Sequence, residues 1–413
     1  MAAFAHKQLL KDGTLLFAST LIVNAGNYFI NLLFGRWLGP EEFSEVSLLV
    51  TLILMLSFLA LGFQLTAGKF FAEYSSEENS KVIPAFVNWL HKLSLGTGII
   101  IGLLLGGFSY IWRVFFNIHS IYPFIILAAG IPFYLVMSVN RGLLQGKTRY
   151  RMLAVTYQVE MWSRFIFSVG LVMLGLGVNG VALGLTMSLI VTFIVSHRNN
   201  KPTSTHPYFP KKTALDFLFM VIVYECSQIL ISNSDTILVK HYFEPGNAGL
   251  YAALALIGRI VFFGTWTVVT LLFPTVIKLE KEGKDHSAYF WGGLAVVAII
   301  ASGIVIGCYL FPVLIVTSLF GKAYLQISPL LWQYAVATSL FACANVFVYY
   351  HLSLNRRAPV WMTVISGILQ IILIILLHAD FTQIILVQVV LMGILLLAMC
   401  LYHFTHSTPK KMP

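Results

Sequence analysis

The sequence predicts an all-α membrane protein of about twelve transmembrane helices in two pseudo-symmetric six-helix lobes. Of its 413 residues, 58% are apolar and only 10% are Asp, Glu, Lys or Arg, whereas a soluble domain is about a quarter charged. Long apolar stretches recur along the whole chain without the alternation of strands. The two halves also share a weak repeat. Together these observations disfavour a soluble enzyme, a disordered chain and a disulfide-rich secreted module.

Each expected helix rests on an apolar stretch of about 20 residues, the length that crosses a bilayer. Lys7 and Lys11 precede the first stretch as in a signal peptide, but the stretch continues to about Leu38 without a small-residue cleavage site, so we expect a retained helix. The pattern is weakest at Pro132 and Gln333. The expected spans are 14–36, 46–66, 83–109, 120–139, 152–174, 178–196, 214–239, 248–274, 288–310, 328–350, 358–378 and 382–402.

The basic residues of the connecting segments lie mostly on one side. The side that holds both termini carries 19 Lys and Arg, including Arg141, which we count in a loop. The other side carries four, and the last three of the 26 lie within spans. Because basic residues favour the cytoplasmic side, both termini are expected in the cytoplasm. The four are Arg36, Arg113, Lys240 and Lys322, and the three are Lys92, Arg164 and Arg259.

A repeat divides the chain near its middle. Pro40 follows the first span and Pro245 follows the seventh, 205 residues later. The segments 144–149 and 353–358 both place basic residues at the cytoplasmic start of a span, with an offset of about 209. These offsets favour two related sets of six helices. We therefore expect an N-terminal lobe at 1–196, a cytoplasmic linker at 197–213 and a C-terminal lobe at 214–413.

Charged residues inside the spans are the first candidates for function, because each is costly in lipid unless it is paired or hydrated. Glu160 and Arg164 are four residues apart, so they lie on one helix face. Glu225 and Arg259 reach similar depths on neighbouring spans and form a candidate pair, and Lys92 lies in the inner half of the third span. The two glutamates either compensate the arginines or take part in proton coupling.

Two spans also carry polar stripes. Asn24, Asn27 and Asn31 follow one face of the first span, while Gln228 and Asp235 extend the stripe that Glu225 begins on the seventh. Such stripes must face other helices or a watery cavity. Interhelical hydrogen bonds are the alternative to substrate binding for the asparagines. An interfacial position is the alternative for Asp235.

No pattern of residues points to a metal, a cofactor or catalysis. The four cysteines form no CxxC pair and the eleven histidines have no ligand spacing. There is no Walker A loop and no nucleophile elbow. We expect a transporter without cofactor, not an enzyme, and no nucleic-acid partner.

The chain carries several short motifs: Leu38-Gly39-Pro40-Glu41-Glu42-Phe43, Gln145-Gly146-Lys147-Thr148-Arg149-Tyr150, Gly175 to Gly184, and Ser234-Asp235-Thr236 followed by Ala248 to Ala253. In their order and spacing these motifs resemble those of the polysaccharide branch of the multidrug/oligosaccharidyl-lipid/polysaccharide exporter superfamily. Ser44 stands where a glycine is usual. The resemblance covers about residues 10–280, and the last third matches mainly in hydropathy.

The resemblance implies an inner-membrane flippase with a central cavity between the lobes and alternating access. Its implied substrate is an oligosaccharide on undecaprenyl diphosphate, with a polysaccharide polymerase and glycosyltransferases as candidate partners. Arg164 and Arg259 would then bind the diphosphate in one cavity, and Asn and Gln side chains would bind sugar hydroxyls. Two alternatives stay open: a cation-coupled multidrug exporter of the same superfamily using Glu225 and Asp235, and a membrane-embedded polysaccharide polymerase.

Overall fold

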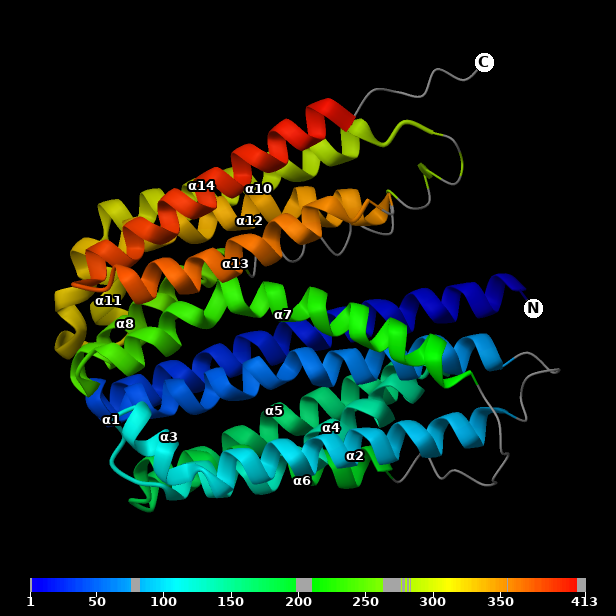
Figure 1. Cartoon of the computed structure of the whole chain (residues 1–413), viewed down its shortest axis with the longest axis horizontal. Helices are drawn as coiled ribbons and strands as arrows, with labels where there is room; N and C mark the ends of the chain where they lie inside the picture. The colour runs from blue at the N-terminus through cyan, green and yellow to red at the C-terminus, as the bar shows by residue number, and fades with distance from the viewer. Residues whose placement is uncertain are drawn as a thin grey trace. The chain divides into compact units, whose positions relative to one another are not determined.

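The protein forms helices in every part of the chain that the structure, a computed structural model, describes (Figure 1). These residues are 2–75, 82–197, 210–262, 276, 279–280, 282, 284–354 and 356–406, with side chains described from Gly13 onward. Ten of the described helices are long and apolar enough to cross a membrane. The chain forms two compact units, Met1–Cys226 and Ser227–Pro413.

The first helix contains the first two expected spans. Helix α1 (Ala2–Tyr74) is interrupted at Gly39, whose backbone has φ 74° and ψ 174°. Glycine adopts this conformation without the steric cost that a Cβ atom brings. Pro40 follows directly and begins the second half, since proline lacks the amide hydrogen that a continuous helix needs. The sequence motif around Pro40 therefore forms the turn between two membrane spans.

Helix α4 is the centre of the first unit. It packs against α1, α2 and α6, while α5 packs against α6 and α1. Close approach depends on glycine: a Cβ atom on Gly142 of α4 would collide with the Gln64 backbone of α1. Pro132 leaves α4 unbroken and packs against Gly98. The bounds are α2 (Ile83–Gly107), α3 (Ser109–Phe115), α4 (Tyr122–Gly146), α5 (Tyr150–Met173) and α6 (Gly177–His197).

The first half of α7 (Lys211–Tyr242) also belongs to the first unit. Ala214 and Leu218 of α7 are buried in a cluster with Phe70 and Phe86. The Lys69 ammonium lies 4.1 Å from the centre of the Phe217 ring. The division between the units at Cys226–Ser227 thus lies inside α7, whereas the sequence predicts a linker at 197–213. Residues 198–209 of that linker lie outside the described residues.

The second unit repeats the packing order of the first. Helix α12 packs against α8, α10 and α14, and α13 packs against α14. Counted by span, the neighbours of α12 correspond to those of α4, and the α13–α14 contact corresponds to the α5–α6 contact of the first unit. Pro245 begins α8, as Pro40 begins the second half of α1. The bounds are α8 (Pro245–Gly258), α10 (Ser287–Leu310), α11 (Pro312–Leu319), η2 (Lys322–Leu330), α12 (Leu331–Ser353), α13 (Ala358–Leu376) and α14 (Phe381–His406).

The expected spans agree with the described helices except at three places. Helix α5 is not among the ten apolar helices because its polar residues lower its mean hydropathy. Helix α8 ends at Gly258, short of the expected end at 274, and residues 263–275 lie outside the described part. Arg141, expected in a loop, is buried inside α4, because α4 continues beyond the apolar stretch to Gly146.

Candidate functional site

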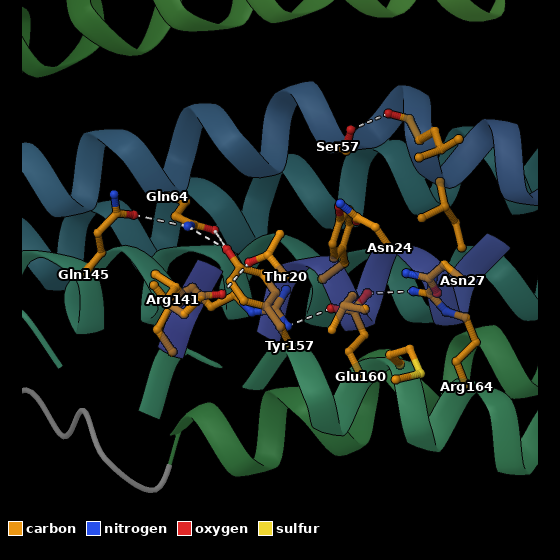
Figure 2. A pocket seen from close by; sticks show the side chains of 17 residues that line it. Thr20, Asn24, Asn27, Ser57, Gln64, Arg141, Gln145, Tyr157, Glu160 and Arg164 are labelled. Carbon is orange, nitrogen blue, oxygen red and sulfur yellow. Dashed lines mark hydrogen bonds and ion pairs between the residues drawn. The ribbon is translucent and has the colours of Figure 1, made fainter. Parts of the chain in front are cut away.

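The first unit contains a cavity of about 440 Å³ between both halves of α1, α4 and α5 (Figure 2). Its lining combines two arginines and a glutamate with four amides and several hydroxyls. The apolar lining residues come mostly from α1 and α5. The polar lining residues are Thr20, Asn24, Asn27, Ser57, Gln64, Tyr134, Arg141, Gln145, Tyr157, Glu160 and Arg164.

Glu160 joins the two arginines of this cavity. Its Oε2 lies 2.7 Å from Nη2 of Arg141, and its Oε1 accepts a hydrogen bond of 2.6 Å from Nη2 of Arg164. All three side chains are at most 15% exposed. Charge-assisted hydrogen bonds of this length are the strong ones. The structure thus pairs Glu160 with Arg164, and it adds Arg141, a second cation that the sequence analysis missed.

The two arginines differ in how fully they are held. Arg141 also donates to the side chain and carbonyl oxygen of Thr156, and its guanidinium lies 4.3 Å from the centre of the Tyr157 ring. Arg164 donates from Nη1 to Asn27 at 3.0 Å, but its Nε is buried with no hydrogen-bond partner. Nε of Arg259 in the second unit is likewise buried without a partner. Arg164 is therefore held by fewer hydrogen bonds than Arg141.

Amide side chains surround the arginines on the α1 and α4 sides. Gln64 donates to Gln145 at 3.2 Å and to the Tyr157 hydroxyl at 3.0 Å. Figure 2 shows these amides toward the Arg141 end of the cavity and Asn27 beside Arg164. Amides and hydroxyls both donate and accept, so they suit a ligand rich in hydroxyl groups.

The cavity carries a net positive charge. Two guanidinium groups and one carboxylate leave a formal charge of +1. Unlike exposed charges, these groups are shielded from water, so their effect on a ligand is stronger than at a surface. The arrangement can bind an anion next to a polar, uncharged group.

The second unit holds a different polar cluster around Asp235. Its carboxylate, 1% exposed, accepts hydrogen bonds from the hydroxyls of Tyr334 at 2.7 Å and Tyr251 at 3.0 Å, and from Gln388 at 3.3 Å. Nη2 of Arg259 lies 3.0 Å from the same group. Asp235 is therefore buried among the helices of the second unit.

Arg259 is held on several sides within this cluster. It donates to Asn233 at 3.1 Å and to Thr236 at 2.8 Å, besides Asp235. The space beside it is only about 20 Å³, roughly one water molecule. The structure pairs Arg259 with Asp235, ten residues further along α7, instead of with the expected Glu225.

Arg259 also lies at the C-cap of α8, and residues 260–262 directly beyond it are again helical. The carbonyl oxygen of Gly258 accepts a hydrogen bond from Thr338 of α12 at 2.9 Å. The Phe262 amide, which a continuing α-helix would bond to Gly258, donates instead to Arg259. The regular hydrogen bonding of the helix is therefore interrupted at this position.

The other residues singled out from the sequence lie at separate places. Asn24 and Asn27 line the cavity of the first unit, whereas Asn31 donates to the Asn27 carbonyl oxygen on its own helix. Lys92 is exposed on α2 and does not line that cavity. Glu225 is half-buried on the first-unit part of α7. Gln228 has an amide nitrogen that is buried with no hydrogen-bond partner.

Gln64 and Gln145 are further cavity residues that the sequence analysis missed. Both lie near the ends of apolar stretches, where polar residues are usually interfacial. A signal was present, since Gln64 follows an uninterrupted apolar run from Phe58 to Phe63.

Among the residues with described positions, no group of three His, Cys, Asp or Glu is placed to hold a metal ion.

The fold is that of MOP-superfamily membrane transporters. The lipid II flippase MurJ, in an inward closed conformation, matches with a TM-score of 0.73 and 16% identity over 96% of this chain and 88% of that one. An inward-facing multidrug resistance MATE transporter matches with a TM-score of 0.71 and 14% identity over 94% of this chain and 96% of that one. An outward-facing multidrug resistance MATE transporter has a TM-score of 0.68 and 16% identity over 96% of this chain and 97% of that one.

The family is shown by the sequence. Residues 9–280, about two thirds of the chain, match the family described as "Polysaccharide biosynthesis protein". The chain belongs to this family and is a multi-pass membrane protein. No curated protein matches the sequence. The resemblance that the short motifs indicated is thus confirmed.

Proposed function

We propose that the protein moves undecaprenyl-diphosphate-linked oligosaccharide across the bacterial cytoplasmic membrane by alternating access. Both termini would lie in the cytoplasm, as the distribution of basic residues predicts. The family and the fold support transport of a saccharide precursor. Glycosyltransferases would supply such a substrate and a polysaccharide polymerase would consume it.

The observation that carries the proposal is that two arginines of the cavity, Arg141 and Arg164, share a single glutamate. A diphosphate cannot cross hydrocarbon without compensation of its charge. The cavity provides that compensation through its net positive charge, carried by Arg141 and Arg164. The neighbouring Gln64 and Gln145 offer donors and acceptors to sugar hydroxyls.

The same geometry argues against a cation-coupled drug exporter. Such a carrier needs a carboxylate that is available to a proton, a metal ion or a cationic drug. Glu160 already accepts from two guanidinium groups, so the positive charge of this cavity would repel a cationic drug. In the second unit, Asp235 is likewise occupied by Arg259 and two tyrosines.

Replacing Arg164 tests the proposal. We expect Arg164→Ala to abolish surface polysaccharide in a flippase-deficient strain while its membrane abundance stays normal, because one of the two cations is lost. The matched control is Arg149→Ala, which removes an exposed arginine outside the cavity. Normal polysaccharide with Arg164→Ala would reject the proposal.

A binding measurement separates affinity from the transport cycle. Purified protein in lipid nanodiscs should bind inorganic pyrophosphate, and Arg164→Ala should weaken that binding on the order of tenfold, the effect of a charged hydrogen bond. Equal binding by the two proteins would place the anion elsewhere.

A further inference from the structure

A second hollow of the first unit lies on the other side of the wall that α1 and α5 form. This α1–α5 groove has a volume of about 900 Å³ and is lined by the N-terminal part of α1 and the first two turns of α5. Its walls are apolar, with Leu15 and Ile22 from α1 and Val155 from α5. These three side chains are between 43% and 53% exposed.

The groove and the cavity use alternate faces of the same two helices. On α1, Leu15 and Ala18 face the groove while Leu16 and Thr20 line the cavity. On α5, Gln158 lines the groove while its neighbour Tyr157 lines the cavity. One helix–helix seam therefore separates an apolar binding surface from a cationic one.

Polar links join α1 and α5 across the seam. Gln158 donates to the side chain and the carbonyl oxygen of Ser19, at 2.9 and 3.1 Å. Further along, Gly26 packs directly against the side chain of Met161, with no room for a Cβ atom. The next residue of α1, Asn27, accepts the 3.0 Å hydrogen bond from Arg164 of α5.

Among the side chains that the structure describes, one charged side chain, Arg151, lines the groove at its end. Arg151 stands in the first turn of α5, on the side of the chain where basic residues gather. From Arg151 to Gln158 the groove follows α5 for about 10 Å. An occupant would therefore be a narrow hydrocarbon segment with an anionic group at one end.

We propose that the α1–α5 groove binds the phosphate-proximal isoprenoid segment of the lipid-linked substrate, with Arg151 contacting its phosphate before the headgroup passes into the cavity. This rests on the proposed function, since only a substrate whose headgroup uses the cavity gives the groove a role in transport. Charge complementarity with Arg151 and the shared wall single out a prenyl phosphate as the occupant. The isoprenoid stays in the groove while the seam opens for the headgroup.

Photolabelling tests the groove. Protein in nanodiscs of phosphatidylethanolamine and phosphatidylglycerol is exposed to farnesyl diphosphate that carries a diazirine on its chain. We expect the label on the peptides 14–22 and 151–158. Ala18→Trp and Val155→Trp fill the groove at exposed positions and should reduce the label on the order of fivefold. Ser302→Trp, in the groove between α10 and α12, is the matched control and should leave it unchanged.

The contribution of the Arg151 charge is tested in the same photolabelling assay. Arg151→Ala should lower the labelling, whereas Arg149→Ala, close by in the chain and outside the groove, should not. Labelling that spreads equally over α10 and α14, survives both tryptophan variants, or is competed as well by phosphatidylglycerol as by unlabelled farnesyl diphosphate would overturn the proposal.

Pyrophosphate binding keeps the two proposals distinguishable. Ala18→Trp and Val155→Trp should bind inorganic pyrophosphate as the wild type does, because the cavity lining is intact. Absence of pyrophosphate binding in the wild type would count against the proposed function. Normal pyrophosphate binding with no label in the groove would reject the groove alone.

Discussion

Glu160 sets the charge of the candidate site, because one carboxylate holds two guanidinium groups in place. Its two oxygens are divided between Arg141 and Arg164, at 2.7 and 2.6 Å. The same carboxylate competes with any anionic ligand for these donors. Glu160 thus stabilises the empty cavity and opposes its occupation.

The variant Glu160→Gln separates these two effects. The formal charge of the cavity rises from +1 to +2, so we expect tighter pyrophosphate binding that weakens more steeply with salt. The free energy of unfolding should fall by about 1–3 kcal/mol, since the two cations lose their charged partner. Thermal unfolding and pyrophosphate titration at two salt concentrations measure both. Weaker binding at unchanged stability would show that Glu160 itself contacts the ligand.

At the scale of the helices, the cavity depends on how closely α1 approaches α4. Gly142 makes that approach possible, because its α-carbon faces the Gln64 backbone where no Cβ atom fits. Gln64 is also the amide that donates to Gln145 and Tyr157. The close approach of α1 to α4 therefore also determines where Gln64 lies in the cavity.

Gly142→Ala should consequently push α1 away from α4 and displace Gln64. We expect a loss of stability of about 1–3 kcal/mol, the usual cost of overpacking, and reduced transport. The control is Gly170→Ala in α5, where a Cβ atom meets nothing within 4 Å and alanine favours the helix. Thermal unfolding of both variants measures the loss of stability. Equal stability of Gly142→Ala and Gly170→Ala would contradict the prediction.

Most of the helices could be predicted from the sequence, because an apolar stretch of bilayer length has few other ways to fold. Pairing along one helix was also predictable, as with Glu160 and Arg164 four residues apart. Pairing between residues on different helices could not be predicted from the sequence. Asp235 and Glu225 lie on the same face of α7, about 15 Å apart along its axis, and the sequence alone does not say which of them Arg259 reaches; in the structure it is Asp235.

Arg141 shows a second limit of sequence-based prediction. A charge near the end of an apolar stretch is normally assigned to the loop, since the exact end of a membrane helix is not encoded in hydropathy. Its buried position depends on Glu160 and Thr156 of another helix, which supply the charge and hydrogen bonds that offset the cost of burial.

Across the whole molecule, the two units share a packing order but not an electrostatic character. In the first, two cations share one carboxylate beside a cavity of about 440 Å³. In the second, one cation and one carboxylate balance each other beside a space of about 20 Å³. This difference suggests that the first unit binds the anion and that Arg259 fixes α8 to α7, whereas the sequence predicts a substrate role for both arginines.

Variants of Arg259 decide between these roles. Arg259→Met alone should lower the free energy of unfolding by about 3 kcal/mol, because it leaves the buried Asp235 without its cation. Adding Asp235→Leu should recover part of that loss, since an apolar pair needs no charge compensation. If Arg259 is structural, the double variant keeps wild-type pyrophosphate affinity, measured by titration of the purified protein in nanodiscs. A drop in affinity comparable to that of Arg164→Ala, at recovered stability, would instead give Arg259 the substrate-binding role that its charge within a span predicts.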